Sequence, residues 1–215
     1  MTGETHCPLC TDADISAYVA DKRRHYLYCD VCGLVFVPPV FFLQPQAERA
    51  IYDLHQNEIT DPGYRAFLSR LAVPLLQRIA PGARGLDFGC GPGPALAQML
   101  MQGGAGHVAL YDSFYAPDER VLEGPYDFIC ATEVVEHLHQ PGRELDRLWS
   151  LLQPGGWLAL MTKLVLSKAA FAHWHYKNDP THVCFFSAKT WQWWAQQHGA
   201  SVEIIGADVI LLRRD

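Results

Sequence analysis

The sequence lacks any hydrophobic stretch long enough to cross a bilayer, because no window approaches the run of about 18 apolar residues that a membrane-spanning helix needs. Its first residues, MTGETHCPLC, have neither the basic start nor the apolar core of a secretion signal. Positive charge is also scarce, with 17 Lys and Arg against 23 Asp and Glu and a net charge of -6. These absences predict a cytoplasmic protein with no membrane partner.

The shortage of positive charge also argues against nucleic-acid binding, which needs a basic surface. The main basic cluster is Lys22, Arg23, Arg24 and His25. Three adjacent cations are typical of a solvated loop, and an RNA contact is the alternative interpretation. The apolar share of 49% is that of a globular protein with a core, and 215 residues suffice for one domain plus a small module.

Cysteine, by contrast, is present seven times, and in a cytoplasmic chain this indicates metal or redox chemistry before disulfides. Cys7 and Cys10 form one C-x2-C pair, and Cys29 and Cys32 form another after eighteen residues. This spacing is typical of a zinc ribbon, in which the two pairs complete a tetrahedron of thiolates. We therefore expect a structural zinc ion that takes no part in catalysis. The other three cysteines are expected to be buried apolar residues: Cys90, Cys130 and Cys184.

The chain divides at two places. A β-rich run over 33–37 is stopped by Pro38 and Pro39, which predicts a zinc ribbon over 1–40, a helical linker over 41–80 and a main domain over 81–215. The linker is expected to hold a helix over 64–79 that is bent or split at Pro74.

Strands and helices alternate from residue 81 onward. Strands are expected at 83–89, 107–112, 126–132 and 157–162, helices at 94–104, 141–153 and 187–199, and a final hairpin at 201–206 and 208–214. Such alternation predicts an α/β fold with a doubly wound parallel sheet. The C-terminal hairpin would add an antiparallel strand at one edge.

A glycine-rich loop follows the first of these strands, and glycines there let a ligand approach the backbone without a Cβ clash. Asp112 ends the next strand about 20 residues on, where an acid can hold ribose hydroxyls. A dinucleotide would favour G-x-G-x-x-G, but the loop is G-C-G-P-G-P-A, with Asp87 two residues before it. An anion at that position does not suit a pyrophosphate. It suits a ligand with an ammonium group, such as S-adenosylmethionine.

Four stretches in order, LDFGCGPG, VALYD, YDFICATEVVEHL and LLQPGGWLALMT, resemble the class I S-adenosylmethionine-dependent methyltransferases over residues 81–215. The resemblance implies a Rossmann-like sheet of seven strands that ends in a reversed hairpin. It also implies that the cofactor is bound by Asp87, Gly89, Gly91, Gly93, Asp112 and Thr132. A Rossmann-like domain that has lost its ligand is the alternative.

The chain departs from this family after Asp112, because only thirteen residues separate it from Tyr126. The family usually fits a helix, a third strand and an adenine-binding acid there. Phe114 or Tyr115 is expected to stack on the adenine instead, and the candidate acids are Asp118 and Glu119.

Glu133, Glu136 and His137 stand at i, i+3 and i+4, which on a helix would place them on one face at the carboxyl edge of the sheet. The same E-x-x-E-H occurs in the metal-assisted small-RNA 2′-O-methyltransferases. By that resemblance His182 is the fourth ligand of Mg²⁺ or another divalent metal, which would bind a vicinal diol or catechol. Without a metal, Glu133 would lie near the cofactor and His182 or His175 would be the general base.

The segment HWHYKNDPTHVCFF, over 173–186, is therefore the predicted acceptor pocket. Its expected wall is Trp174, Tyr176, Phe185 and Phe186, while Lys177 would meet an acidic substituent and His173 would be exposed. In the family a lid over the cofactor often sits where this chain has Tyr52, His55 and Asn57, with an ordinary linker as the alternative.

The predicted function is methyl transfer from S-adenosylmethionine to a small-molecule acceptor, most simply at a hydroxyl oxygen. C-methylation of a sugar is a variant, because similar chains with a ribbon and a methyltransferase domain include such enzymes. RNA methylation with the ribbon as the RNA-reading module is a second possibility. The third is a non-enzymatic S-adenosylmethionine-binding scaffold whose ribbon recruits a protein.

Overall fold

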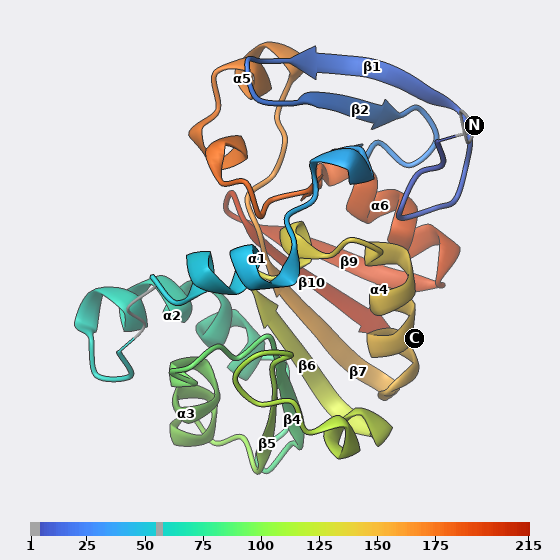
Figure 1. The fold of residues 1–215 in the computed structure, drawn as a ribbon. Coiled ribbons are helices and arrows are strands. Elements are labelled where there is room, and N and C mark those ends of the chain that lie inside the picture. The colour runs from blue at the N-terminus through green and yellow to red at the C-terminus, as the bar shows by residue number, and fades with distance from the viewer. Residues whose placement is uncertain (1–4, 55–57) are drawn as a thin grey trace.

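The computed structural model describes residues 5–54 and 58–215, and it contains two sheets (Figure 1). The large sheet has the strand order β5-β4-β6-β7-β10-β9. Its strands are β4 (Gly85–Phe88), β5 (Val108–Tyr111), β6 (Tyr126–Thr132), β7 (Leu152–Met161), β9 (Ala200–Ile205) and β10 (Val209–Arg214). The first four strands of this order are parallel, and β10 is antiparallel to β7 and β9. The predicted α/β fold and its terminal hairpin are confirmed.

The sheet has six strands within the described residues, so the expectation of seven was wrong. The strand that is missing would have followed Asp112. The short segment there forms an isolated bridge between Asp112 and Ala116 and then a 3-10 helix, η2 (Glu119–Glu123), before β6 begins. Thirteen residues are too few for a helix and a strand together, so β5 becomes the edge of the sheet.

Helices cover both faces of the large sheet. The α-helices are α1 (Pro45–Tyr52), α2 (Pro62–Leu76), α3 (Ala95–Gln102), α4 (Pro141–Ser150), α5 (Lys168–Ala172) and α6 (Ala188–Gln197). The remaining 3-10 helices are η1 (Pro39–Phe41), η3 (Val135–His137) and η4 (His175–Asn178). Alternate residues of β6 pack on opposite sides, with Phe128 and Cys130 against α2 and α3 and with Ile129 and Ala131 in the core shared with α4 and α6. This alternation is what a strand buried on both faces requires.

Helix α2 runs unbroken through Pro74, against the expectation of a split at that residue. It begins with Asp61, whose side chain accepts a hydrogen bond from the Tyr64 N–H, and with Pro62 at the first helical position. Both are favoured helix starts. Pro74 lies in the last turn, where the helix is about to end, so little of it remains to be interrupted.

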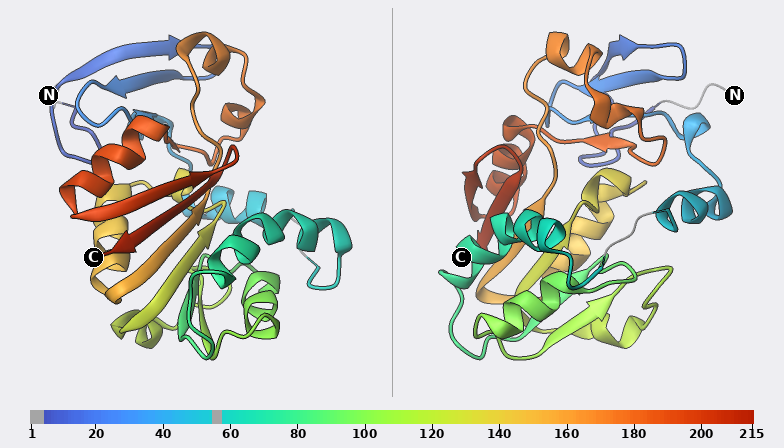
Figure 2. Two further views of the ribbon diagram at one scale, coloured as in Figure 1. Left: turned by 180° about the vertical axis from the view of Figure 1, so that it is seen from behind. Right: turned by 90° about the vertical axis from the view of Figure 1, so that its left-hand side faces the viewer.

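The small sheet contains β1 (Ile15–Ala20), β2 (His25–Cys29), β3 (Val35–Phe36) and β8 (Cys184–Phe185), in that order. Three of these strands come from the predicted ribbon, and β8 comes from the far end of the sequence. The small sheet lies beyond the carboxyl end of β6, over one end of the large sheet (Figures 1 and 2). Among the described helices, none is both long and apolar enough to cross a membrane.

Candidate active site

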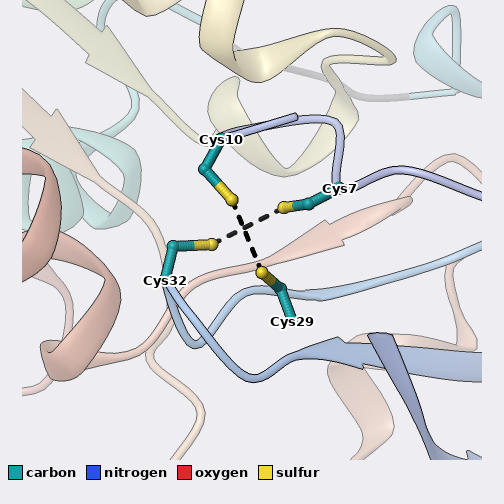
Figure 3. Close-up of side chains that lie close together, drawn as sticks. All are labelled: Cys7, Cys10, Cys29 and Cys32. Carbon is teal, nitrogen blue, oxygen red and sulfur yellow. Dashed lines mark hydrogen bonds between the residues drawn. The ribbon is translucent and has the colours of Figure 1, made fainter. Parts of the chain in front are cut away.

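The four paired cysteines converge at one point of the small sheet. Their Sγ atoms lie within 4.8 Å of one another, with 3.5 Å between those of Cys7 and Cys32 and 3.4 Å between those of Cys10 and Cys29 (Figure 3). The hydrogen bond from Cys32 lowers the pKa of Cys7 to about 6, whereas burial raises the pKa of Cys10 to about 12. All four thiols can ionise together only with a cation between them. The geometry is compatible with zinc.

The glycine loop after β4 is held by its own backbone and by Asp112. Gly89 and Gly91 have φ values of 75° and 62°, in the left-handed region that favours glycine. The Gly89 and Cys90 N–H groups donate to the Tyr111 carbonyl at 2.7 and 3.1 Å. The loop is therefore fixed against the carboxyl end of β5 before any ligand arrives.

Asp112 uses both carboxylate oxygens on backbone groups. Oδ2 accepts from the Gly91 N–H at 3.0 Å, and Oδ1 accepts from the N–H groups of Phe114 and Tyr115 at 2.8 and 3.1 Å. The side chain thus joins the glycine loop to the short segment that replaces the missing strand. Ribose binding by Asp112 stays a prediction, to which the structure adds this organising role.

Asp87 is buried at the end of β4, with 2% of its surface exposed. Burial raises the pKa of its carboxyl to about 7, and the nearby charge of Asp112 adds to the rise. A buried anion needs a compensating cation. The fold therefore favours a ligand that brings positive charge to Asp87.

One large cavity, of about 1090 Å³, collects these groups. The predicted residues that line it are Asp87, Gly89, Gly91, Gly93, Asp112, Phe114, Tyr115, Thr132, Glu133, His137, His175 and His182. Neither Asp118 nor Glu119 lines it, and Asp118 is paired with Arg120 at 2.7 Å. The lining instead includes Tyr111, Arg143 and Arg147, which sequence reasoning missed.

A family model for a methyltransferase domain matches residues 61–203, well over half of the chain. The chain belongs to the methyltransferase family. It is an S-adenosylmethionine-dependent methyltransferase, as the motifs predicted. A search of curated proteins finds no match to the sequence.

Solved structures with the same fold include three methyltransferases. A 1,6-didemethyltoxoflavin N1-methyltransferase from Burkholderia thailandensis, with S-adenosylhomocysteine bound, has a TM-score of 0.55 and 15% identity over 93% of this chain and 99% of its own. The magnesium protoporphyrin IX methyltransferase of Synechocystis has a TM-score of 0.51 and 16% identity over 79% and 94%. An O-methyltransferase family protein from Burkholderia thailandensis has a TM-score of 0.51 and 14% identity over 81%, and the chain spans only 61% of its length. At these identities the likeness shows the fold alone.

The E-x-x-E-H motif of this methyltransferase does not form one helical face. Glu133 has a left-handed φ of 52°, and only Val135–His137 are helical, as η3. As a result Glu136, His137 and His182 bring one ligand atom each within 4.8 Å of one another, and Glu133 is not part of this group. Three of the four expected ligands therefore meet.

The two histidines of this group are oriented by backbone carbonyls. His182 Nδ1 lies 2.8 Å from the Tyr176 carbonyl oxygen, and His137 Nδ1 lies 3.3 Å from that of Thr181. Because a carbonyl oxygen only accepts, Nδ1–H is the donor in each of these hydrogen bonds, and Nε2 of His182 lies 3.9 Å from Asp179 Oδ2. This is the orientation in which metal-bound and catalytic imidazoles are usually held.

Tyr176 lies between the two glutamates. Its hydroxyl donates to Glu136 Oε1 in a short hydrogen bond and lies 3.3 Å from Glu133 Oε2. Burial raises the pKa of Glu133 to about 7 and that of Glu136 to about 8. Burial and the two carboxylates also raise the pKa of Tyr176, so its phenol keeps its proton.

The predicted acceptor segment supplies fewer cavity residues than expected. Tyr176 lines the cavity, but Trp174, Phe185 and Phe186 do not. Phe185 and Phe186 are buried in the core, where Phe186 stacks on Trp191 at 4.6 Å. His173 is exposed, as predicted. Both phenylalanines are buried, because β8 and the residue after it are covered on both sides.

Lys177 was assigned wrongly to the acceptor. It is 6% exposed and its ammonium forms an ion pair with Asp21 of the small sheet at 2.6 Å. The lysine that lines the cavity is Lys163, whose Nζ donates to His175 Nε2 at 3.5 Å and lies 5.2 Å from the centroid of the Tyr176 ring. Its place directly after β7, at the carboxyl edge of the sheet, was the available sequence signal.

Helix α1 lies beside the cavity, where the lid was expected, and none of its residues is buried. Tyr52 lines the cavity, and its ring meets that of His137 at 5.3 Å. Asp53 accepts a hydrogen bond from the Tyr115 hydroxyl at 2.6 Å. The other two lid candidates, at positions 55 and 57, lie outside the described residues, and a lid function stays a prediction.

Burial of Asp87 predicts a stability that falls as pH rises. Because its folded pKa of about 7 lies above the unfolded value near 4, the folded state binds the proton more tightly, and this stabilisation is lost as pH rises from about 4 to about 7. Asp87→Asn should therefore melt at a higher temperature than the wild type at pH 8 without cofactor, and the difference should be smaller at pH 5. Scanning calorimetry at both pH values tests this, and parallel pH profiles would contradict it. The same variant should bind S-adenosylmethionine more weakly.

Proposed function

We propose that this methyltransferase transfers the methyl group of S-adenosylmethionine to a hydroxyl oxygen of a small acceptor that carries a negative charge. The observation that carries the proposal is the convergence of Glu136, His137 and His182, with both imidazoles oriented by backbone carbonyls. Such a group can take the proton from an acceptor hydroxyl as its oxygen attacks the sulfonium methyl. His137 and His182 line the same cavity as the glycine loop.

The cofactor side fits S-adenosylmethionine. Asp87 would hold the ammonium group, since the buried carboxyl needs a cation, and Gly89 and Gly91 leave the backbone open to close approach. Phe114, which lines the cavity, offers a ring to the adenine. When bound, the cofactor supplies a methyl group already activated on a sulfonium. The protein mainly has to orient the acceptor and exclude water.

The acceptor side fits a divalent metal ion. One carboxylate and two imidazoles are the ligand set of catalytic zinc sites that keep a position open. Glu136 Oε2 is buried without a hydrogen-bond partner among the described residues, which is costly unless a cation or proton meets it. A metal held by Glu136, His137 and His182 would act as a Lewis acid on the acceptor hydroxyl. His182 alone, with Nε2 as general base, is the second candidate for this role.

We propose zinc for the four-cysteine site as well, in a structural role. The four thiols close a tetrahedral set and leave no position for a substrate. The site lies apart from the cavity, because none of the four cysteines lines it.

Several observations support a small-molecule acceptor. Two of the similar structures are named for small substrates, a toxoflavin precursor and magnesium protoporphyrin IX. The net charge of -6 argues against RNA. Sugar C-methylation would need the same cavity and a base, so only the products of turnover distinguish it from O-methylation.

The negative charge proposed for the acceptor is inferred from Lys163. The ammonium is half-buried in the cavity wall and forms no ion pair with the described carboxylates. Lys163→Met should therefore raise KM for a carboxylated acceptor by roughly tenfold and leave kcat nearly unchanged, because an ion pair of this kind contributes about 1 kcal/mol or more when partly buried. The matched neutral acceptor is the control. An equal loss for both acceptors would contradict a role in charge recognition.

The experiment that tests the proposed function has two stages. Calorimetric titration of S-adenosylmethionine into the full chain should show micromolar binding. Transfer of labelled methyl is then measured to hydroxy acids, catechol acids, sugars and RNA, with and without Mg²⁺, Mn²⁺ or Zn²⁺. Labelled methyl ether in the acid series supports the proposal. Binding with labelled RNA or a carbon-methylated sugar as the only product would overturn it.

A further inference from the structure

The small sheet contacts the loop that carries the acceptor-side residues through Arg24. This arginine follows the β1–β2 turn and is 7% exposed, although its neighbours Lys22 and Arg23 are exposed. Its guanidinium donates to three carbonyls in and just after η4: those of Lys177 and Asp179 at 2.7 and 2.8 Å and that of Pro180 at 3.2 Å. The basic cluster is thus not simply a solvated loop.

The loop that Arg24 holds carries the acceptor-side residues. Tyr176 and His182 flank the three carbonyls, and His182 Nδ1 in turn donates to the Tyr176 carbonyl. Lys177 ties the same loop to the ribbon a second time through its ion pair with Asp21. Burial alone would raise the pKa of Asp21, but Lys177 and the Arg23 and Arg24 N–H groups hold it below its usual range. The pair therefore stays charged.

A second connection runs through the backbone. The Val37 N–H, at the end of the ribbon, donates to the Val183 carbonyl at 2.9 Å, and the Val183 N–H donates to the Glu136 carbonyl at 2.8 Å. The pairing of β3 with β8 continues this connection one residue further along. The ribbon is thereby hydrogen-bonded, through one residue, to the turn that bears Glu136 and His137.

A third connection is made by the first cysteine pair. The Gly142 N–H, in the first turn of α4, donates to the Pro8 carbonyl at 3.2 Å. A Cβ at Gly142 would overlap the Leu9 carbonyl, so the backbone between Cys7 and Cys10 packs directly on α4. In the described residues, no hydrogen bond joins residues 5–37 to the glycine loop over 87–93. The first two connections therefore meet the acceptor side of the site, the third meets α4, and none meets the glycine loop.

We propose that the zinc ribbon is a brace for the acceptor side of the cavity and that Arg24 is its positioning residue. Two of its three connections meet the segments that carry Glu136, His137 and His182, so loss of the brace separates these groups while the cofactor loop stays formed. The catalytic meaning of the brace rests on the proposed function, but its structural effect can be measured without an acceptor.

The test compares Arg24→Met with Lys22→Met in the zinc-loaded full chain. Lys22 is exposed and two residues away, so its substitution removes the same charge without touching the loop. The first readout is the ring-nitrogen NMR spectrum of His182 at pH 8, which reports the tautomer. The second is amide hydrogen exchange over residues 176–186, and the third is calorimetric affinity for S-adenosylmethionine.

In the wild type and Lys22→Met we expect the Nδ1-protonated tautomer. In Arg24→Met we expect that tautomer to be lost and exchange over 176–186 to accelerate by at least about tenfold, since hydrogen bonds to a charged donor are removed. Cofactor affinity should stay within about twofold. Removal of zinc by chelation should reproduce the changes over 176–186. An unchanged tautomer with unchanged exchange would overturn the proposal, and so would an equal loss of cofactor binding.

Asp21→Asn provides a second variant should Arg24→Met fail to fold. It keeps the side-chain shape but weakens the ion pair with Lys177. We expect the same changes over 176–186, smaller in size, and an unchanged glycine loop. These readouts need no acceptor and no metal at Glu136. Unchanged tautomer and exchange together with methyl transfer to hydroxy acids would contradict the brace alone. The expected changes over 176–186 without methyl transfer to hydroxy acids would contradict the proposed acceptor alone.

Discussion

His182→Ala is expected to lower the rate of methyl transfer by roughly 100-fold or more, because a positioned imidazole that takes a proton contributes about 10²–10⁴ in rate. Affinity for S-adenosylmethionine should hardly change, since His182 lies at the other end of the cavity from the cofactor-binding Asp87 in the proposed arrangement. The measurement is single-turnover transfer from bound cofactor, with calorimetry as the check on binding. The loss should appear in kcat and not in the cofactor dissociation constant.

His175→Ala is the matched control for this prediction. Both imidazoles line the cavity, but His175 is exposed and is not oriented by a backbone carbonyl in the way that His182 is. Its substitution should cost less than about fivefold, as expected for an exposed group outside the reaction. A larger loss in His175→Ala than in His182→Ala would move the proton transfer to His175.

Glu136→Gln separates a metal from a base. The amide keeps the size of the side chain and can still accept from Tyr176, but it is a poor metal ligand. If Glu136, His137 and His182 hold a metal, this variant should lose activity about as strongly as His182→Ala and should no longer respond to added metal. Near-normal activity in Glu136→Gln would leave His182 as a base that works alone.

Local patterns of the sequence were sufficient for the cysteine cluster and the glycine loop. The two cysteine pairs, the glycine loop and Asp112 each depend on spacing within one turn or one strand end, and all lie where the pattern placed them. A strand followed by glycines and a helix determines its own geometry, because the backbone requirement is local. The same reasoning explains the terminal hairpin.

The acceptor side could not be read in this way, because its geometry comes from long-range contacts. Arg24 and Lys177 were treated as solvated or substrate-facing cations, yet each is buried by a partner about 150 residues away in the sequence. The pairing of β3 with β8 has the same character. Glu133 was grouped with Glu136 on helical spacing, which its left-handed φ abolishes. Charge and periodicity indicate the local structure and exposure that a residue favours. They do not indicate which distant segment of the chain it contacts.

Gly89→Ala is expected to have the second large effect, on folding and cofactor binding together. An alanine at φ 75° costs about 1–2 kcal/mol in backbone strain. Its Cβ would also overlap Val134 Cγ2, and a β-branched side chain has little freedom to move aside. Overpacking of this kind costs about 1–3 kcal/mol more. S-adenosylmethionine affinity should fall by at least about tenfold, measured by calorimetry, because the loop must shift from the position that Tyr111 and Asp112 hold.

Gly82→Ala separates the strain from the overlap. Its φ of 78° matches that of Gly89, but no other atom lies within 4 Å of the added Cβ, and Gly82 lies before β4, outside the large cavity. In Gly82→Ala the free energy of unfolding in urea should fall only by the backbone strain, and the affinity for S-adenosylmethionine should stay unchanged. The difference between the two variants then measures the Gly89–Val134 contact. Val134 directly precedes η3, so that contact joins the glycine loop to the turn of Glu136 and His137. Equal losses in the two variants would mean that the loop and the turn are positioned independently.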